Sequence, residues 1–252
     1  IAGTSAGSIV GSLLAAGIKP KQIGSFFNFL STIKENELKV MPLSEQKIQG
    51  ISWLPKLPMG ILNSKYLEKI LAIFEQMKKP LAVGATDAYS GEGVVFTSEN
   101  QKLIIPSNSK FAVEKNKIVI EAVSASCAIP GIFTPQTIGK RTLVDGGLVD
   151  NVPADIVKGM GADVVIAVDL GFNVNQPDPF KHMVDILIQT FDIMGQRIAD
   201  LVTADYADLT LKPVTGSARL YDFHKIPHLI ETGRQEAVRM LPEIYRILRM
   251  KK

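Results

Sequence analysis

The first residues of the chain carry a candidate nucleophile. Gly3-Thr4-Ser5-Ala6-Gly7 matches the pattern G-x-S-x-G. In this pattern the serine sits on a sharp strand-to-helix turn, and the flanking glycines make room for that turn. The N–H of Ala6 and the positive end of the following helix would then face a developing oxyanion. The motif predicts Ser5 as nucleophile, with a glycine-rich turn capped by a serine as the alternative. A phosphate-binding loop is disfavoured because the lysine of G-x-x-x-x-G-K-[ST] is missing.

A serine hydroxyl needs a neighbouring base, and histidine is the usual one. The three histidines, His182, His224 and His228, all follow Ser5 in the order of an α/β-hydrolase triad. Their surroundings favour ordinary roles, because His182 begins a strongly apolar helical pattern and the other two flank Ile226-Pro227. A triad that uses one of them stays open as an alternative.

A carboxylate is the other candidate base. Asp145 ends the short apolar run Leu143-Val144 and is followed directly by Gly146 and Gly147. Two glycines let the backbone turn away at once, which would leave the carboxylate exposed in a crevice. A plain Asp-Gly-Gly turn is the alternative for this segment considered alone.

Together these segments resemble the patatin-like phospholipases, a family of lipid acyl hydrolases with a Ser–Asp dyad. The likeness covers about two thirds of the chain, up to residue 170. Its blocks occur in the family's order: IAGTSAGS (1–8), ATDAYSGEGVVF (85–96), VSASCAIPGIFTP (123–135), LVDGGLVDNVP (143–153) and GADVVIAVDL (161–170).

The resemblance implies a role for each matching residue. Ser5 matches the family's nucleophile, Asp145 matches its catalytic aspartate, and Gly146 and Gly147 match its D-G-G turn. The family also places a glycine-rich oxyanion loop with an arginine before the nucleophile, whereas this sequence begins at Ile1. We therefore expect the chain to be truncated at its N-terminus, with the first strand, that loop and the following helix missing.

The implied activity is hydrolysis of fatty-acyl esters of lipids or phospholipids through an acyl-enzyme. The implied fold is a three-layer α/β/α domain over residues 1–252 with a mostly parallel central sheet. No cofactor and no metal is expected. A non-catalytic binding or regulatory module with the same fold is the alternative, and it would be favoured by a true absence of the oxyanion loop.

The composition of the chain excludes several classes of protein. The chain has 252 residues, 46% of them hydrophobic and 21% charged, which excludes a disordered chain. A net charge of +3 is too small to indicate nucleic-acid binding. No apolar run reaches the roughly 18 residues of a membrane span. The single cysteine fits a reducing compartment, so we expect a cytoplasmic protein, with peripheral membrane attachment as the alternative.

Hydrophobic periodicity predicts the elements that must position these residues. Strands are expected at 81–86, 94–97, 143–145 and 164–169, the last two as buried parallel strands. Helices are expected at 5–16, 21–33, 153–160, 179–204 and 229–249, with a further one after Asn63 or Ser64. Alternating strands and helices predict an α/β fold.

For the remaining candidate residues, structural roles are favoured over functional ones. Cys127 is expected to be a small packed residue, and Asp163 and Asp169 are expected to cap elements or face solvent. The broad apolar surface of 179–204 is assigned to the core, with a dimer face or an acyl-chain lining as the alternative. The basic residues near the C-terminus are assigned to a solvated helix face, with attraction to anionic lipid head groups as the alternative. These residues are Arg234, Arg239, Arg246, Arg249, Lys251 and Lys252.

Overall fold

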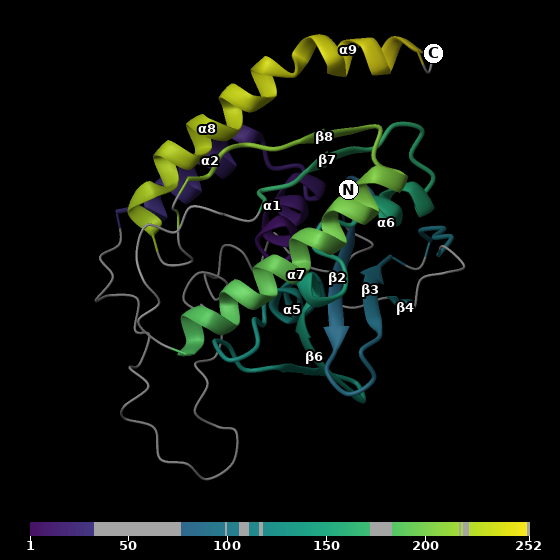
Figure 1. Cartoon of the computed structure of the whole chain (residues 1–252). Helices are drawn as coiled ribbons and strands as arrows, with labels where there is room; N and C mark the ends of the chain where they lie inside the picture. The colour runs from purple at the N-terminus through teal and green to yellow at the C-terminus, as the bar shows by residue number, and fades with distance from the viewer. Residues whose placement is uncertain are drawn as a thin grey trace.

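The computed structural model (Figure 1) describes residues 1–32, 77–98, 100–105, 111–115, 118–171, 183–216, 218 and 222–250. The predicted helix after Asn63 or Ser64 lies outside these ranges. The elements that hold the sheet and the site are β1 (Ala2–Thr4), α1 (Ala6–Ala15), α2 (Pro20–Leu30), β2 (Ala82–Asp87), β3 (Gly93–Thr97), β4 (Phe111–Lys115), α5 (Val119–Ser126), β5 (Gln136–Ile138), β6 (Arg141–Asp145), the 3-10 turn η3 (Gly146–Leu148) and α6 (Ala154–Gly159). They are followed by β7 (Ile166–Val168), α7 (Met183–Tyr206), β8 (Leu209–Leu211), the 3-10 turn η4 (Phe223–Lys225), α8 (Ile226–Arg239) and α9 (Leu241–Met250).

Strand β2 is the centre of a six-stranded sheet in the order β4-β3-β2-β6-β5, with β1 also paired to β2. One edge of β2 pairs with β3 along its length. The other edge is shared, because β1 pairs in parallel with Ala82, Val83 and Gly84, while β6 pairs antiparallel with the following three residues. The end of β1 therefore meets the end of β6 at the middle of β2.

The predicted α/β class is confirmed, but the prediction of a mostly parallel sheet was wrong for the described strands. Only β1–β2, β3–β4 and β7–β8 are parallel, whereas β2–β3, β2–β6 and β5–β6 are antiparallel. The antiparallel pairs β2–β3 and β5–β6 are joined by connections too short for a parallel crossover. The strand at 143–145 thus belongs to an antiparallel pair.

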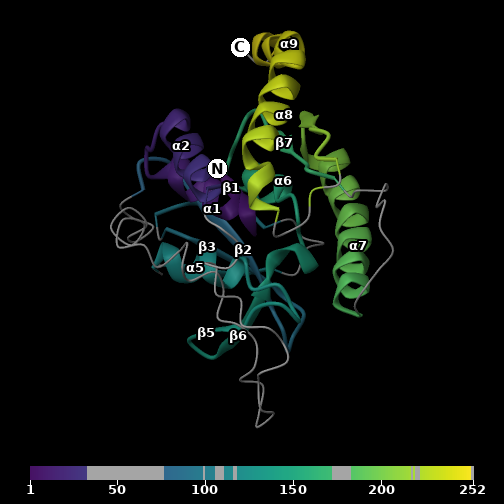
Figure 2. The same cartoon turned by 90° about the vertical axis from the view of Figure 1, so that its left-hand side faces the viewer.

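Helices cover both faces of the sheet, with α1 and α5 on one face and α6 on the other (Figure 2). Successive strand residues face different cores, in keeping with the alternation of side chains along a strand. Val83 and Ala85 pack into the main cluster with residues of α1 and α5, while Ala82 packs with Ile156 of α6. This arrangement gives the three expected layers.

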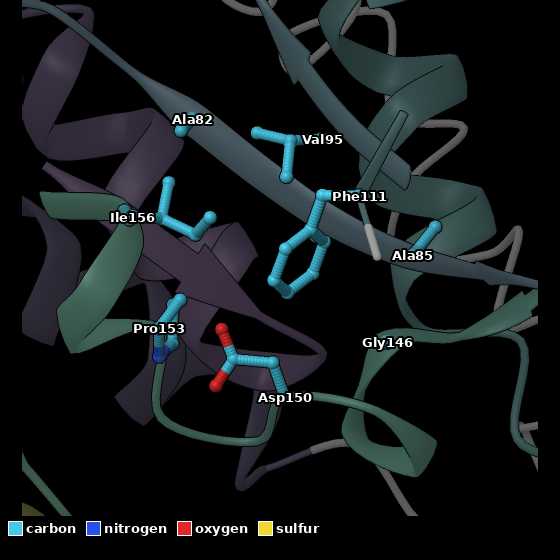
Figure 3. Close-up of a pocket in the computed structure, with 10 residues that line it drawn as sticks. Ala82, Ala85, Val95, Phe111, Gly146, Asp150, Pro153 and Ile156 are labelled. Atoms are coloured by element: carbon cyan, nitrogen blue, oxygen red, sulfur yellow. The ribbon is translucent and has the colours of Figure 1, made fainter. Parts of the chain in front are cut away.

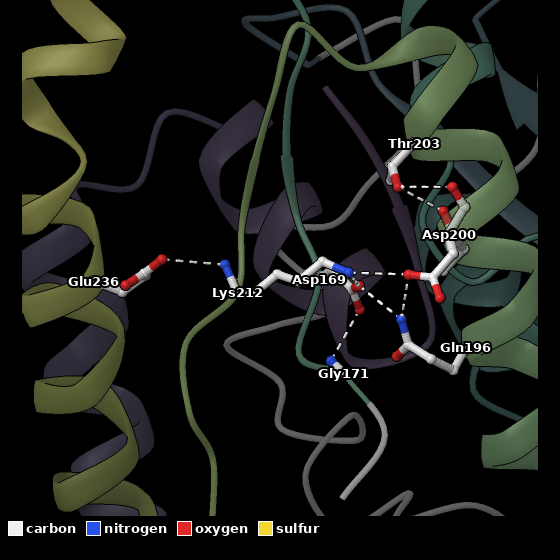
Figure 4. Close-up of polar contacts among 8 residues, drawn as sticks. Asp169, Gly171, Gln196, Asp200, Thr203, Lys212 and Glu236 are labelled. Carbon is white, nitrogen blue, oxygen red and sulfur yellow. Dashed lines mark hydrogen bonds and ion pairs between the residues drawn. The ribbon is translucent and has the colours of Figure 1, made fainter.

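The two-stranded sheet β7–β8 is fixed to its surroundings through Asp169, which follows β7 (Figure 4). Asp169 was expected to cap an element or to face solvent, and the solvent-facing alternative was wrong, because its side chain is 1% exposed. It accepts hydrogen bonds from Gly171 N–H (2.9 Å) and Gln196 Nε2 (3.0 Å), and lies 3.2 Å from Lys212 Nζ. A buried charge needs such partners, and here they tie β7, β8 and α7 together. The expectation that the strand at 164–169 is buried was also partly wrong, since Ile166 and Val168 are exposed.

The helix predicted at 229–249 is two helices. α8 ends at Arg239 and α9 begins at Leu241, with Met240 between them. Pro242 explains the break, because proline has no N–H and its ring clashes with the carbonyl of the preceding turn. Both helices extend away from the sheet in Figures 1 and 2. Their arginines Arg234, Arg239 and Arg246 each pair with a glutamate three residues earlier.

Candidate functional site

Ser5 lies at the turn between β1 and α1, as the motif predicts. Its backbone angles are φ 50° and ψ −127°, and within the described residues no other non-glycine has a positive φ. This conformation is costly for a residue with a side chain, and such strain is concentrated at functional sites. The turn also brings Gly3 against the Gly7 carbonyl, so that a Cβ at Gly3 would clash with it. Gly7 itself has open space around it and contributes through its backbone.

Hydrogen bonds from two directions hold Ser5 in this conformation. Its N–H donates to Ser126 Oγ (2.9 Å), at the end of α5. Its carbonyl oxygen accepts from Ser8 N–H (2.9 Å) and Ser8 Oγ (2.7 Å), in the first turn of α1. Ala6 is exposed at the first position of α1, where backbone N–H groups have no partner within the helix. Its N–H therefore has no partner within the helix.

Asp145 ends β6 and is buried, with 6% of the residue exposed. Its N–H donates to the Ala128 carbonyl (3.0 Å), and its Oδ1 accepts from Gly147 N–H (2.8 Å). The sharp turn that makes this second bond requires glycine at 146, because a Cβ there would come within 2.5 Å of the Gly84 carbonyl oxygen. The Asp-Gly-Gly segment therefore fixes the orientation of the carboxylate.

The two side chains meet because of the register on β2. Thr4 pairs with Gly84, and Asp145 pairs with the next residue, Ala85. Burial raises the pKa of Asp145 to about 6, while the hydrogen bonds from Gly147 N–H and the Ser5 side chain oppose this shift. A carboxylate with this pKa is a better proton acceptor near neutral pH than a solvated aspartate.

A pocket of about 140 Å³ opens onto this pair. The loop after α5, the turn η3 and helix α7 form its walls. Most of its other lining side chains are apolar, which suits a hydrocarbon chain. The lining residues are Ser5, Ile129, Pro130, Asp145, Gly147, Leu148, Asn151, Ile188, Phe191, Asp192 and Gly195.

The histidine alternative receives no support from this arrangement. His224 lies in η4 and His228 in α8, and neither lines the pocket of Ser5. His182 lies outside the described residues. Within the described part of the chain, no group of three His, Cys, Asp or Glu side chains is arranged to hold a metal ion.

Three residues of the site had not been singled out from the sequence. Ser126 anchors the Ser5 backbone, while Asn151 and Asp192 line the pocket. These residues lie far from Ser5 along the chain, so no local sequence pattern around Ser5 could reveal them. Cys127, predicted to be packed, is buried beside Ser8, and burial raises the pKa of its thiol to about 12. It is therefore a neutral thiol at physiological pH.

Another buried carboxyl lies on the other face of the sheet. Figure 3 shows Asp150 directed into a small pocket lined by apolar groups such as Val95, Phe111 and Ile156. Burial and the neighbouring carboxyl of Asp155 raise the pKa of Asp150 well above the ordinary aspartate value. The proximity of two buried carboxyls favours a state in which at least one of them is protonated.

The fold and this turn define an α/β protein with a serine at a strand–helix elbow, opposed by a buried aspartate. The model of the patatin-like phospholipase family matches residues 1–158, and the chain belongs to that family. The match includes β1, the Ser5 turn, β2 and the Asp-Gly-Gly segment.

Several curated proteins are similar over part of their length. An uncharacterized NTE family protein of Mycobacterium tuberculosis is 28% identical over 176 residues, covering 68% of this chain and 40% of that protein. Patatin-like phospholipase domain-containing protein 7 of Rattus norvegicus is 31% identical over 140 residues, covering 45% of this chain and 10% of that protein. The uncharacterized protein YqhO of Bacillus subtilis is 26% identical over 166 residues, covering 61% of this chain and 54% of that protein. The chain thus spans less than two thirds of each of these relatives.

Among the described helices, none combines the length and the apolar character that crossing a bilayer requires.

Proposed function

We propose that this chain is the catalytic part of a serine acyl hydrolase that cleaves fatty-acyl esters of lipids through a Ser5–Asp145 dyad. The observation that carries the proposal is the meeting of a strained serine and a buried aspartate in one largely apolar pocket. Membership of the patatin-like phospholipase family supports lipid acyl hydrolysis in general.

In the first step the Ser5 hydroxyl attacks the carbonyl carbon of the ester and its proton passes to the Asp145 carboxylate. The carbonyl oxygen becomes an oxyanion, which the Ala6 N–H and the N-terminal end of α1 would stabilise. Collapse of the intermediate breaks the ester bond, and the alcohol leaves with the proton from Asp145. The acyl group remains on Ser5 Oγ.

In the second step Asp145 accepts a proton from water, and the resulting hydroxide attacks the acyl carbonyl. The fatty acid is released, and Ser5 recovers its proton from Asp145. Asp145 can serve both steps because its pKa of about 6 leaves it mostly ionised at neutral pH.

The test uses a fluorophosphonate probe on the full-length protein that contains this chain. We expect Ser5→Ala to abolish labelling and hydrolysis of a lipid ester, and Asp145→Asn to reduce both strongly. Ser25→Ala is the matched control, because Ser25 is an exposed serine of α2 whose hydroxyl donates to the Lys21 carbonyl and which does not line the pocket of Ser5. Labelling that persists in Ser5→Ala would refute the nucleophile assignment. Wild-type turnover in Asp145→Asn, together with its loss on substitution of His182, His224 or His228, would favour a histidine triad instead.

A further inference from the structure

Besides the dyad, one charged side chain lines the pocket of Ser5 in the described part of the chain. Asp192 lies on α7, directly after Phe191, and both line the pocket. Among the described residues Asp192 forms no hydrogen bond or ion pair. Its side chain is solvent-accessible, yet the surrounding protein desolvates it enough to raise its pKa above the ordinary aspartate value.

The packing of α7 on its neighbours fixes the position of Asp192. Gly195, one turn after Asp192, is buried against η3, where a Cβ would lie 3.6 Å from the Gly147 carbonyl oxygen and 3.8 Å from Asn151 Nδ2. Ile188, one turn before, packs against the main core. Residues three or four apart lie on one face of a helix, so Asp192 lies on the same face as these two packed residues and lines the pocket between them.

The charges around the pocket then favour particular ligands. None of its described lining residues is lysine, arginine or histidine, whereas both charged ones are carboxylates. An anionic group that enters would meet two negative charges, with no cation among the described lining residues to offset the loss of its hydration. A zwitterionic, cationic or neutral group would meet no such penalty.

We propose that Asp192 is a specificity residue that makes this site discriminate against anionic head groups, so that its substrates are acyl esters of zwitterionic or uncharged alcohols. This inference rests on the proposed function, because it assigns the substrate class of the same Ser5 site. Asp192 acts here through its charge at the pocket mouth and takes no part in proton transfer.

The experiment compares kcat/KM for two lysophospholipids with the same lauroyl chain, both below their micellar concentrations, with the full-length protein. One is the zwitterionic lysophosphatidylcholine and the other is the anionic lysophosphatidylglycerol. We expect the wild type to prefer the zwitterionic ester. Asp192→Asn, which keeps the shape and removes the charge, should raise the anionic-to-zwitterionic ratio by about threefold to tenfold, as expected for a partly screened pair of charges.

Asp205→Asn is the matched control, because Asp205 is an exposed aspartate of the same helix that does not line the pocket. It changes the net charge equally and should leave the ratio unchanged. Asp192→Glu should keep the wild-type ratio, which separates charge from packing. An equal ratio in Asp192→Asn and the wild type, or an equal rise in Asp205→Asn, would overturn the inference while leaving the dyad intact. Hydrolysis of both esters by Ser5→Ala would refute the proposed function itself.

Discussion

Thr4 and Asp145 lie end to end along one edge of β2, paired with the successive residues Gly84 and Ala85. Because Ser5 follows Thr4, this register brings the serine and the aspartate together although 140 positions separate them. The parallel strand β1 and the antiparallel strand β6 therefore pair with the same edge of β2. The glycine after Asp145 makes the arrangement possible, since a side chain at that position would press into β2.

Gly146→Ala is accordingly expected to disrupt the site. The new Cβ would lie 2.5 Å from the Gly84 carbonyl oxygen and 2.9 Å from Thr4 Cγ2, so β1 and β6 must move apart. We expect loss of most activity and a stability loss of about 1–3 kcal/mol, typical of overpacking. Thermal unfolding and probe labelling measure the two effects. Gly24→Ala, in open space on α2, is the control and should be neutral or slightly stabilising.

The strain at Ser5 gives a second prediction. Glycine tolerates a positive φ, so Ser5→Gly relieves the strain that Ser5→Ala retains. We expect Ser5→Gly to be more stable than Ser5→Ala by about 1 kcal/mol, in a comparison of two inactive variants by denaturant unfolding. At most positions within helices and strands, by contrast, a glycine variant is less stable than the corresponding alanine variant. A less stable Ser5→Gly would show that the elbow carries no net strain.

The pKa of Asp145 gives a prediction for the pH dependence of the proposed activity. The base must be ionised to accept a proton, so kcat/KM should rise with pH and level off above an apparent pKa of about 6. Below this pKa, a plot of log kcat/KM against pH should have a slope of 1, as expected when one group must lose its proton. Asp145→Asn should abolish this pH dependence along with most of the activity. A profile centred near 4 would mean that Asp145 is solvated in the working enzyme.

The buried carboxyl of Asp150 predicts a stabilising substitution. Its folded-state pKa lies above the unfolded value, so the folded state binds more protons and loses stability as pH rises through the folded-state pKa. Asp150→Asn removes this charge. We expect its melting temperature to exceed that of the wild type at pH 8, and the difference to shrink on acidification to pH 5. Asp163→Asn, outside the buried pair, is the control for net charge. A constant difference across this pH range would contradict the titration account.

The local sequence was enough to predict many of the elements and both members of the proposed dyad. Ser5 and Asp145 were found because a nucleophile turn and an Asp-Gly-Gly turn each need glycines at fixed spacing, a steric demand that acts within a few residues. Helix positions also followed from periodicity, as for α1 and α7. The broken helix at Met240 was missed although Pro242 signalled it, because the apolar pattern continues across the break.

Tertiary structure alone decided what surrounds the proposed dyad. The sequence does not state that β2 holds β1 and β6 on one edge, since strand pairing depends on contacts between distant segments. The same is true of Ser126, which anchors Ser5 from 121 positions away, and of Asp192, which reaches the pocket only through the packing of α7 on η3. The pKa of Asp145 likewise depends on its burial, which is a property of the assembled core. Local sterics thus determined which residues could react, and long-range packing determined their environment.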